Sequence, residues 1–296
     1  MRVLVTGANG LVGSRLVSML AARGHEVTAT GRGQQRLGTA SYFSADLGDA
    51  GALHFLAGTA KPEVIVNCGG MTDVDGCERE QAQAWAANVE GPATLSRAAN
   101  ALGAHLVHVS TDYIFDGAAG PYDVDAIANP RGVYAATKFA GELAVRTLAS
   151  SWAIARTAVV FGWPAAGRNN FGSWVVTTLR DSKQLKLFDD QWVSPSLALN
   201  VAEMLAELAV KKLSGVFHTS GAEVVDRVTY GRAVAKKFGF DEGLIVPSHM
   251  RDVKLAIPRP VRSGLDVSKT VAALETKPLT LAQALEQFHA EYQGAP

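Results

Sequence analysis

The chain has 296 residues, 48% of them hydrophobic and 19% charged, which is enough apolar material for one large domain or two interleaved domains. Lys and Arg together number 28, as do Asp and Glu. This zero net charge argues against a nucleic-acid partner and against a basic membrane-surface protein.

The N-terminus and the cysteines indicate the compartment. A strand-like run begins at Arg2, which leaves no room for a signal peptide, and no apolar run reaches the ~18–20 residues of a membrane span. Cys68 and Cys77 are too few for a secreted disulfide scaffold and lack a histidine at metal-ligand spacing. We therefore expect a cytoplasmic protein with reduced thiols, no membrane partner and no metal.

The first half of the chain alternates predicted strands and helices. Apolar runs predict strands at 2–6, 25–30, 64–67, 105–110 and 152–161. Helical spacing predicts helices at 11–23 and at 78–102, the second interrupted by Gly91-Pro92. Strands separated by helices require βαβ crossovers, so we predict an α/β fold with a doubly wound, Rossmann-like parallel sheet. Ligands bind such sheets at the carboxyl ends of the strands.

The pattern loosens after Phe161, where we predict a smaller C-terminal α/β substrate lobe. Its features are a loop at 162–170, a helix from Phe171, an acidic turn at Asp189-Asp190, a helix at 201–212 and a largely irregular segment at 251–262. We expect residues 1–160 to form a dinucleotide-binding domain to which 185–213 returns. The substrate-binding lobe would then consist of 161–184 and 214–296.

A glycine-rich loop joins the first predicted strand to the first predicted helix. Gly7 and Gly10 permit backbone angles and close approaches that a Cβ would forbid, and Gly13 lets the helix pack closely on the strand. A helix N-terminus presents free N–H groups and a positive dipole to a pyrophosphate. The candidate cofactor-binding residues of this loop are Gly7, Asn9, Gly10, Leu11, Val12 and Gly13.

The residue after the second strand bears on the choice of cofactor. NAD sites usually place a carboxylate there for the ribose 2′-hydroxyl, whereas an arginine suits a 2′-phosphate. Arg32 occupies this place, and no Asp or Glu lies between Glu26 and Asp46. We expect NADPH as the cofactor, with NADH as the alternative.

A tyrosine and a lysine four residues apart begin a later helix. Tyr134 and Lys138 share one helical face, so the ammonium, helped by an oxidised nicotinamide, can stabilise a phenolate and lower the pKa of the phenol by about 2–3 units. Ketone reduction needs such a proton donor for the emerging alkoxide. Thr111, at a strand end, is the expected third member that orients the carbonyl, with Ser110 as the alternative.

Other polar residues have simpler interpretations. His105 and His108 face opposite sides of an alternating strand, which favours core or rim positions over metal ligation. Asn88 has two interpretations, a proton relay or a structural hydrogen bond.

The motifs together resemble the dTDP-4-dehydrorhamnose reductase family of the extended short-chain dehydrogenase/reductase superfamily. They read TGANGLVG, PEVIVNCGGMTDVDGCERE, STDYIFDG, NPRGVYAATKFAGE, RTAVVFG, DQWVSPS and PRPVRSGLD, and they run nearly end to end. The resemblance implies NAD(P)H reduction of the C4 ketone of a nucleotide-linked 4-keto-6-deoxy sugar, in deoxysugar or rhamnose biosynthesis. It also implies catalytic roles for Thr111, Tyr134 and Lys138, and a homodimer as a candidate assembly.

Further site residues follow from the resemblance alone. Those expected near the cofactor are Asp46, Leu47, Cys68, Gly69, Gly70 and Val109, together with Tyr134 and Lys138. Those expected near the nucleotide-sugar substrate are Thr72, Thr111, Asp112, Val159, Asn170, Gln191 and Arg262. The chain departs from the family at Val159, where Trp is frequent, at Val193 and Ser196, which replace Gly and Thr, and at Cys68-Gly69-Gly70, which replaces an alanine run.

Two other functions stay open. A non-catalytic regulatory subunit, similar to the methionine adenosyltransferase β subunit, would bind NADP without turnover. A nucleotide-sugar epimerase or dehydratase would use the same loop; epimerases retain NAD, and dehydratases commonly carry carboxylates after the catalytic threonine, where this chain has Asp112 and then Tyr113.

Overall fold

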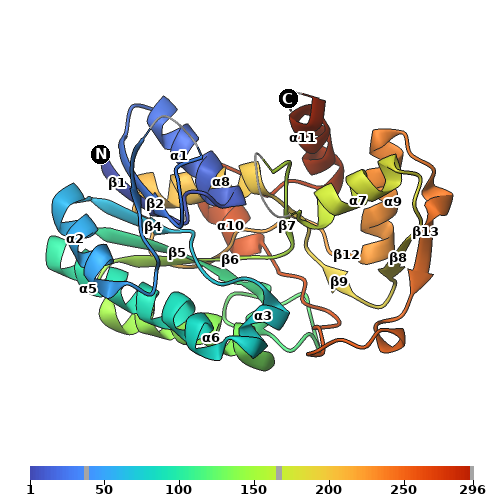
Figure 1. Cartoon of the computed structure of the whole chain (residues 1–296), viewed down its shortest axis with the longest axis horizontal. Helices are drawn as coiled ribbons and strands as arrows, with labels where there is room; N and C mark the ends of the chain where they lie inside the picture. The colour runs from blue at the N-terminus through green and yellow to red at the C-terminus, as the bar shows by residue number, and fades with distance from the viewer. Residues whose placement is uncertain (37–39, 165–168, 294–296) are drawn as a thin grey trace.

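The computed structural model describes residues 1–36, 40–164 and 169–293. Its largest element is a parallel sheet of seven strands in the order β3-β2-β1-β4-β5-β6-β11 (Figure 1). The strands are β1 (Arg2–Thr6), β2 (Glu26–Gly31), β3 (Ser41–Ser44), β4 (Val64–Asn67), β5 (His105–Thr111), β6 (Trp152–Thr157) and β11 (Gly215–His218). The predicted α/β fold with a doubly wound parallel sheet is confirmed.

Helices cover both faces of this sheet (Figure 1). On one face lie α1 (Leu11–Ala22) and α8 (Ala198–Val210); on the other lie α2 (Ala50–Ala60), α5 (Gly91–Leu102) and α6 (Gly132–Leu148). Along β1, Val3 and Val5 enter the core under α1 and α8, whereas Leu4 enters the opposite core. This alternation is the two-residue period of a strand buried on both faces. A short helix, α10 (Ser268–Ala273), packs beside β11.

The remaining elements form what we call the small lobe, with a core of its own. It contains α7 (Phe171–Arg180), α9 (Arg227–Phe238), α11 (Leu281–Gln293) and the short strands β7 (Val160–Phe161), β8 (Leu185–Phe188), β9 (Trp192–Val193), β10 (Ser196–Leu197), β12 (Val225–Asp226) and β13 (Ile245–Ser248). Single-turn 3-10 helices follow β5 of the main sheet, at Asp112–Ile114, and flank β13, at Glu242–Leu244 and Met250–Asp252. The small lobe lies at the carboxyl end of the main sheet (Figure 1).

Two segments lie elsewhere than the sequence predicts. β8, expected to return to the main sheet with 185–213, pairs with β13 instead, because Leu185 and Leu187 are buried in the core of the small lobe. Of that segment, α8 and the following Leu213 pack against the main sheet. β11, expected in the substrate lobe with 214–296, is an edge strand of the main sheet, where Val216 and Phe217 enter its two opposite cores.

The helix predicted at 78–102 is divided into several pieces. It consists of α3 (Val74–Arg79), α4 (Gln81–Trp85), a π-helical turn at Ala86–Glu90 and α5. Gly91 and Pro92 do not interrupt the helix: they form the start of α5 directly after the π-helical turn, and the first turn of a helix tolerates proline. Residues 165–168 of the predicted loop 162–170 lie outside the described residues.

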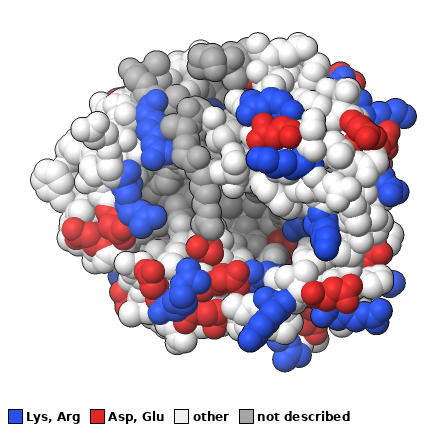
Figure 2. Space-filling view, turned by 45° about the vertical axis from the view of Figure 1, so that its right-hand side comes forward, with Lys and Arg blue, Asp and Glu red and all other residues white. Residues whose placement is uncertain are grey.

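The equal numbers of basic and acidic residues are reflected in a mixed distribution of charge on the surface. On the face shown in Figure 2, Lys and Arg side chains are interspersed with Asp and Glu. Within the described residues, no helix has both the length and the apolar character that crossing a membrane requires.

Candidate active site

The glycine loop after β1 is packed too closely for larger residues. A Cβ on Gly7, whose φ is +67°, would lie 2.6 Å from the backbone nitrogen of Gly69, and a Cβ on Gly13 would lie 2.3 Å from the carbonyl oxygen of Gly7. Helix α1 begins at Leu11 with Gly10 as N-cap and no side-chain cap, so its first N–H groups face outward. This geometry fits a pyrophosphate at the helix N-terminus.

Asn9 fixes the loop that follows β2. Its Nδ2 donates to the carbonyl oxygens of Arg32 and Gln34 at 2.9 and 3.0 Å and lies 2.8 Å from the Tyr42 hydroxyl. Arg32 lies 3.9 Å from the carboxylate of Asp46, and both side chains are mostly exposed. The structure thus brings Arg32 and Asp46 to the same edge of the sheet as the glycine loop.

A second wall of the candidate cofactor site follows β4. A Cβ on Gly69 would lie only 2.5 Å from the Leu47 side chain. A Cβ on Gly70 would lie 2.9 Å from Oδ1 of Asn88. The Cys68 thiol is buried, which raises its pKa to about 12, so it remains a neutral thiol. Glycines at 69 and 70 therefore keep side chains out of the space at this wall. Lys138 lies beside it, since its Nζ would be 3.8 Å from a Cβ on Gly70.

A buried polar network joins β1, β4 and β5 next to the glycine loop and Gly69. Thr6 donates to Oδ1 of Asn67 at 2.6 Å, and the same oxygen accepts from the backbone N–H of Gly69 at 3.1 Å. Nδ2 of Asn67 lies 3.1 Å from Nδ1 of His108, and burial lowers the pKa of His108 well below its usual value. His105, on the same strand, pairs with the Ser151 hydroxyl. Both histidines are buried residues of the sheet, as their positions in an alternating strand indicate.

Tyr134 and Lys138 lie in the first turns of α6. Nζ of Lys138 donates to the carbonyl oxygen of Val109 at 2.6 Å, which anchors α6 to the end of β5. Burial lowers the pKa of Lys138 to about 8, although the charge of Glu142 opposes this shift. Burial also raises the pKa of Tyr134, and its interaction with Thr111 only partly offsets that effect. The lowered phenol pKa expected from the sequence is therefore not produced by the protein's own residues, because desolvation of the buried phenol outweighs its neighbours.

The end of β5 places two oxygen groups near this pair. The Thr111 hydroxyl caps a 3-10 turn by accepting from the Tyr113 N–H, and it donates to Asp112 at 3.2 Å. Asp112 is buried, and burial raises the pKa of its carboxyl to about 6. The ring of Tyr113 packs edge-on against Tyr134, with centroids 5.6 Å apart. The Ser110 hydroxyl is buried and has no hydrogen-bond partner among the described residues.

Asn88 lies in the π-helical turn, and its side chain forms three hydrogen bonds with residues outside that turn. Its carboxamide accepts from the N–H of Met71 at 2.8 Å, donates to the carbonyl of Met71 at 3.0 Å and donates to the Thr137 hydroxyl at 3.1 Å. π-Helical turns are frequent at functional sites. Of the two interpretations of Asn88, these bonds support the structural one, because they tie the loop after Gly70 to α6.

A pocket of about 280 Å³ lies between Tyr113 and the small lobe. Nε of Arg227 donates to Gln191 at 3.0 Å, and its guanidinium stacks 4.6 Å from the centroid of the Phe171 ring. Arg259 donates to Asp75 at 2.7 Å. The pocket is lined by Tyr113, Phe171, Trp174, Lys186, Leu187, Phe188, Gln191, Arg227, Leu255 and Arg259. Sequence reasoning found Gln191 but missed both arginines. Arg259 lies in the PRPVRSGLD stretch, in which Arg262 was expected instead, and no local motif marks Arg227.

The other expected substrate residues do not line this pocket. Asn170 is occupied as the N-cap of α7, where it accepts from Ser173 and donates to the Gly162 carbonyl. Arg262 is exposed, and Thr72 is exposed just before α3. Val159 lies beside the small-lobe core with a φ of +41°, an unusual angle for a β-branched residue.

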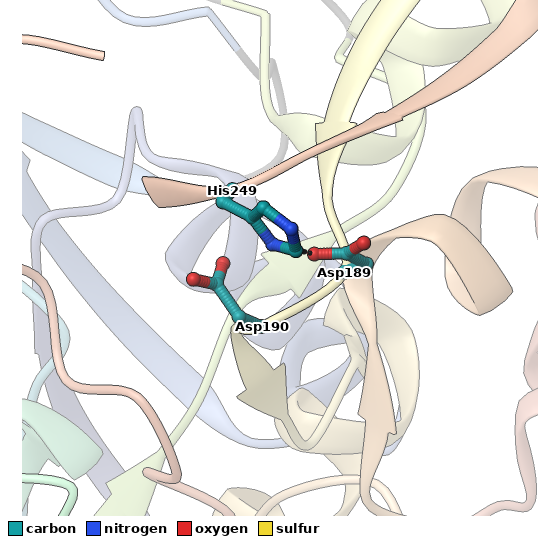
Figure 3. Close-up of side chains that lie close together, drawn as sticks. All are labelled: Asp189, Asp190 and His249. Atoms are coloured by element: carbon teal, nitrogen blue, oxygen red, sulfur yellow. Dashed lines mark ion pairs between the residues drawn. The ribbon is translucent and has the colours of Figure 1, made fainter. Parts of the chain in front are cut away.

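A group of possible metal ligands lies apart from this site. Asp189, Asp190 and His249 converge at the ends of β8 and β13 (Figure 3), with ligand atoms within 4.8 Å of one another. Asp189 forms an ion pair with His249 at 2.6 Å, and Asp190 accepts from the N–H of Met250. Asp189 is thus paired with His249, and Asp190 binds the backbone of the residue after His249.

Known proteins resemble this chain over nearly its full length. Residues 1–294 match the family described as the RmlD substrate binding domain. The dTDP-4-dehydrorhamnose reductase of Streptomyces griseus is 35% identical over 279 residues, which cover 92% of this chain and 88% of that protein. A Haloferax volcanii protein named "Probable low-salt glycan biosynthesis reductase Agl14" is 33% identical over 297 residues, covering 99% of this chain and 98% of that protein.

Solved structures share the fold. The dTDP-4-dehydrorhamnose reductase of Clostridium acetobutylicum has a TM-score of 0.89 and 26% identity, and the match covers 99% of this chain and 100% of that chain. The Bacillus anthracis dTDP-4-dehydrorhamnose reductase, solved in complex with NADP, has a TM-score of 0.84 and 24% identity, covering 98% of this chain and 99% of that chain. This chain therefore belongs to the RmlD substrate binding domain family and is a nucleotide-sugar reductase of that family.

Proposed function

We propose that this protein uses NADPH to reduce the C4 ketone of a nucleotide-linked 4-keto-6-deoxy sugar, as a step of deoxysugar biosynthesis of the rhamnose type. The observation that carries the proposal is the meeting of Tyr134 and Lys138 with the end of β5, between the glycine loop and the arginine-lined pocket. Lys138 is anchored on Val109 at 2.6 Å and borders the Gly70 wall. Tyr134 contacts Tyr113, which lines the pocket.

The proton chemistry follows from the burial of these groups. When bound, NADPH supplies the hydride that adds to the carbonyl carbon. A raised pKa keeps the Tyr134 phenol protonated, which is the form that can donate a proton to the carbonyl oxygen. Lys138 places positive charge near the phenolate that remains, and Thr111 offers a hydroxyl to orient the carbonyl. One N–H of Lys138 is used on Val109, which leaves two for the cofactor ribose.

The pocket suits the nucleotide diphosphate of the substrate. Arg227 is fixed by Gln191 and by the Phe171 ring, and Arg259 is fixed by Asp75, so two guanidinium groups are held at its wall. Guanidinium groups pair with phosphate oxygens in a planar, bidentate manner. Phe171 and Trp174 supply aromatic surface suited to a nucleobase. Arg32, at the end of β2, supports NADPH over NADH because it can pair with a 2′-phosphate.

A panel of keto-sugar nucleotides with NADPH or NADH tests this function. We expect oxidation of NADPH with a dTDP-linked 4-keto-6-deoxyhexose, and a higher kcat/KM with NADPH than with NADH. Tyr134→Phe should lower kcat by about 10²–10⁴-fold with little change in the Kd of NADPH, because the proton donor alone is removed. Tyr292→Phe, in α11 of the small lobe, is the matched control and should turn over normally.

Three outcomes would contradict the proposal. Near-normal turnover by Tyr134→Phe would exclude the phenol as the acid. Binding of NADPH without turnover of any keto-sugar would favour a regulatory subunit. NAD retained through purification would favour an epimerase or dehydratase, and absorbance of the purified protein detects it.

A further inference from the structure

A buried ion pair lies one helical turn beyond Lys138. Glu142 has no exposed surface, and its two carboxylate oxygens accept from Nε and Nη2 of Arg156 at 3.0 and 2.9 Å. Arg156 comes from β6, donates its Nη1 to the Val124 carbonyl at 3.0 Å and lies 5.4 Å from the centroid of the Phe115 ring. Every nitrogen of this guanidinium is therefore bound, and the pair is rigid.

Stability alone does not explain such a pair. Removing two charges from water costs several kcal/mol per ion, and apolar residues of similar volume often serve a core equally well. In this geometry the Glu142 carboxylate is one half of a bidentate ion pair with the Arg156 guanidinium. The fold thus maintains a negative charge in the core beneath the proposed site.

That charge acts on Lys138. Positions 138 and 142 share one face of α6, because residues four apart are neighbours on a helix. Lys138 is itself buried, and its hydrogen bond to Val109 is to a neutral carbonyl. Glu142 is the carboxylate whose charge favours the protonated lysine, against the desolvation that disfavours it.

We propose that the Glu142–Arg156 pair positions a fixed negative charge that keeps Lys138 protonated, and that it thereby sets the upper end of the pH range in which the site works. This inference rests on the proposed reductase function. Glu142 is a positioning residue, since it acts through Lys138.

The other groups around Lys138 keep one charge state over the working range of pH. Cys68, after β4, is a buried thiol whose pKa is raised to about 12, and His108, on β5, is a buried neutral imidazole whose pKa is lowered by burial. Tyr134, on α6, has a raised pKa and stays neutral. Around Glu142 itself lie Arg156, Arg146 at 3.5 Å, and His218 of β11, whose pKa burial lowers to about 4.

The test is Glu142→Gln, which keeps the shape of the side chain and removes its charge. We expect the alkaline limb of the kcat profile to move to lower pH by about one unit, since loss of a nearby opposite charge shifts a pKa by about that amount. The Kd of NADP⁺, measured by fluorescence without sugar, should rise several-fold near pH 9 and stay unchanged near pH 6.5. Glu142→Asp should restore part of both shifts. Glu90→Gln, on an exposed turn, is the control and should match the wild type.

A second variant keeps the proposal testable if Glu142→Gln folds poorly. Glu142→Leu with Arg156→Met removes both charges and leaves an apolar core, so it should fold and show the same alkaline shift. Superimposable pH profiles for wild type and either variant would overturn the proposal, as would an equal loss at every pH. The NADP⁺ titration separates the two claims: a shift in binding without turnover by the wild type would sustain the role of Glu142 and sink the reductase function.

Discussion

At the residue scale, the Asp112 carboxyl is buried where a charge is costly. Burial raises its folded-state pKa to about 6, despite the hydrogen bond from Thr111 and the charge of Arg227. Because this value lies above the ordinary value of 3.8, the folded state is penalised once the group ionises, and stability falls as pH rises from about 4 to about 6. Asp112→Asn should therefore raise the free energy of unfolding by up to about 3 kcal/mol at pH 8 and by little at pH 4.

Urea unfolding at the two pH values measures this difference. Asp125→Asn, on an exposed loop, is the control and should change stability little at either pH. We expect the stabilised Asp112→Asn variant to lose activity, because the carboxyl lies 3.2 Å from the Thr111 hydroxyl. A gain in stability that is the same at pH 4 and pH 8 would show that the charge is not its source.

Residues marked by local spacing could be predicted, and those brought in by packing could not. Tyr134 and Lys138 are recognisable because an i, i+4 pair needs only one helix, and Thr111 because it ends a strand. Arg227 reaches the pocket at the start of α9 after a long separation in sequence, and Glu142 matters only through its bond to β6. Neither relation leaves a local pattern in the sequence.

At the element scale, α6 crosses the π-helical turn at a glycine. A Cβ on Gly141 would lie 2.2 Å from the carbonyl oxygen of Asn88, which is backbone and cannot move aside cheaply. Gly141→Ala should destabilise the protein by about 1–3 kcal/mol and reduce kcat, since α6 must shift together with Tyr134. Gly58→Ala, in α2 with nothing within 4 Å of its Cβ, should instead stabilise it by about 0.5–1 kcal/mol.

Thermal or urea unfolding of the two alanine variants measures the contrast. The same chemical change is made in both helices, so helix propensity cannot account for opposite signs. If Gly141→Ala were as stable and as active as the wild type, the close crossing of α6 and the π-helical turn would not matter for the site.

Long, strongly patterned elements were predictable, and the breaks within them were not. β4 (Val64–Asn67) matches its predicted range. Helix α1 ends at Ala22, one residue before the predicted end of that helix. The π-helical turn escapes prediction because its geometry depends on the tertiary bonds of Asn88 to Met71 and Thr137. Two-residue strands such as β9 and β10 are too short to show any period.

At the scale of the whole molecule, the two cores are interleaved along the chain. The chain leaves the main sheet after β6, enters the small lobe, and returns with α8 and β11 before it ends in α11. The sequence predicts the return but misplaces its limits, because β8 and β11 have similar apolar runs that belong to different cores. Composition cannot distinguish which core receives a short apolar strand.

An ion pair joins these two bodies close to the cofactor loop. Arg15, in α1, contacts Glu291, in α11, at 2.8 and 3.1 Å, and it donates to the carbonyl oxygens of Leu11 and Trp163 at 2.9 Å each. Glu291 also accepts from the Trp163 N–H at 2.9 Å, and both side chains are mostly buried. The contact fixes the small lobe relative to the first turn of α1.

Glu291→Ala should destabilise the protein by about 1–3 kcal/mol, because the Arg15 guanidinium and the Trp163 N–H lose a charged partner. It should also raise the KM of the keto-sugar more than the Kd of NADPH, since the small lobe carries the arginine-lined pocket while α1 keeps its own glycine loop. Unfolding curves and steady-state kinetics measure the two effects. Asp181→Ala breaks the exposed pair with Lys183 and should cost less than about 0.5 kcal/mol. Equal losses in NADPH and sugar affinity would mean that the ion pair supports the cofactor loop itself and not the placement of the small lobe.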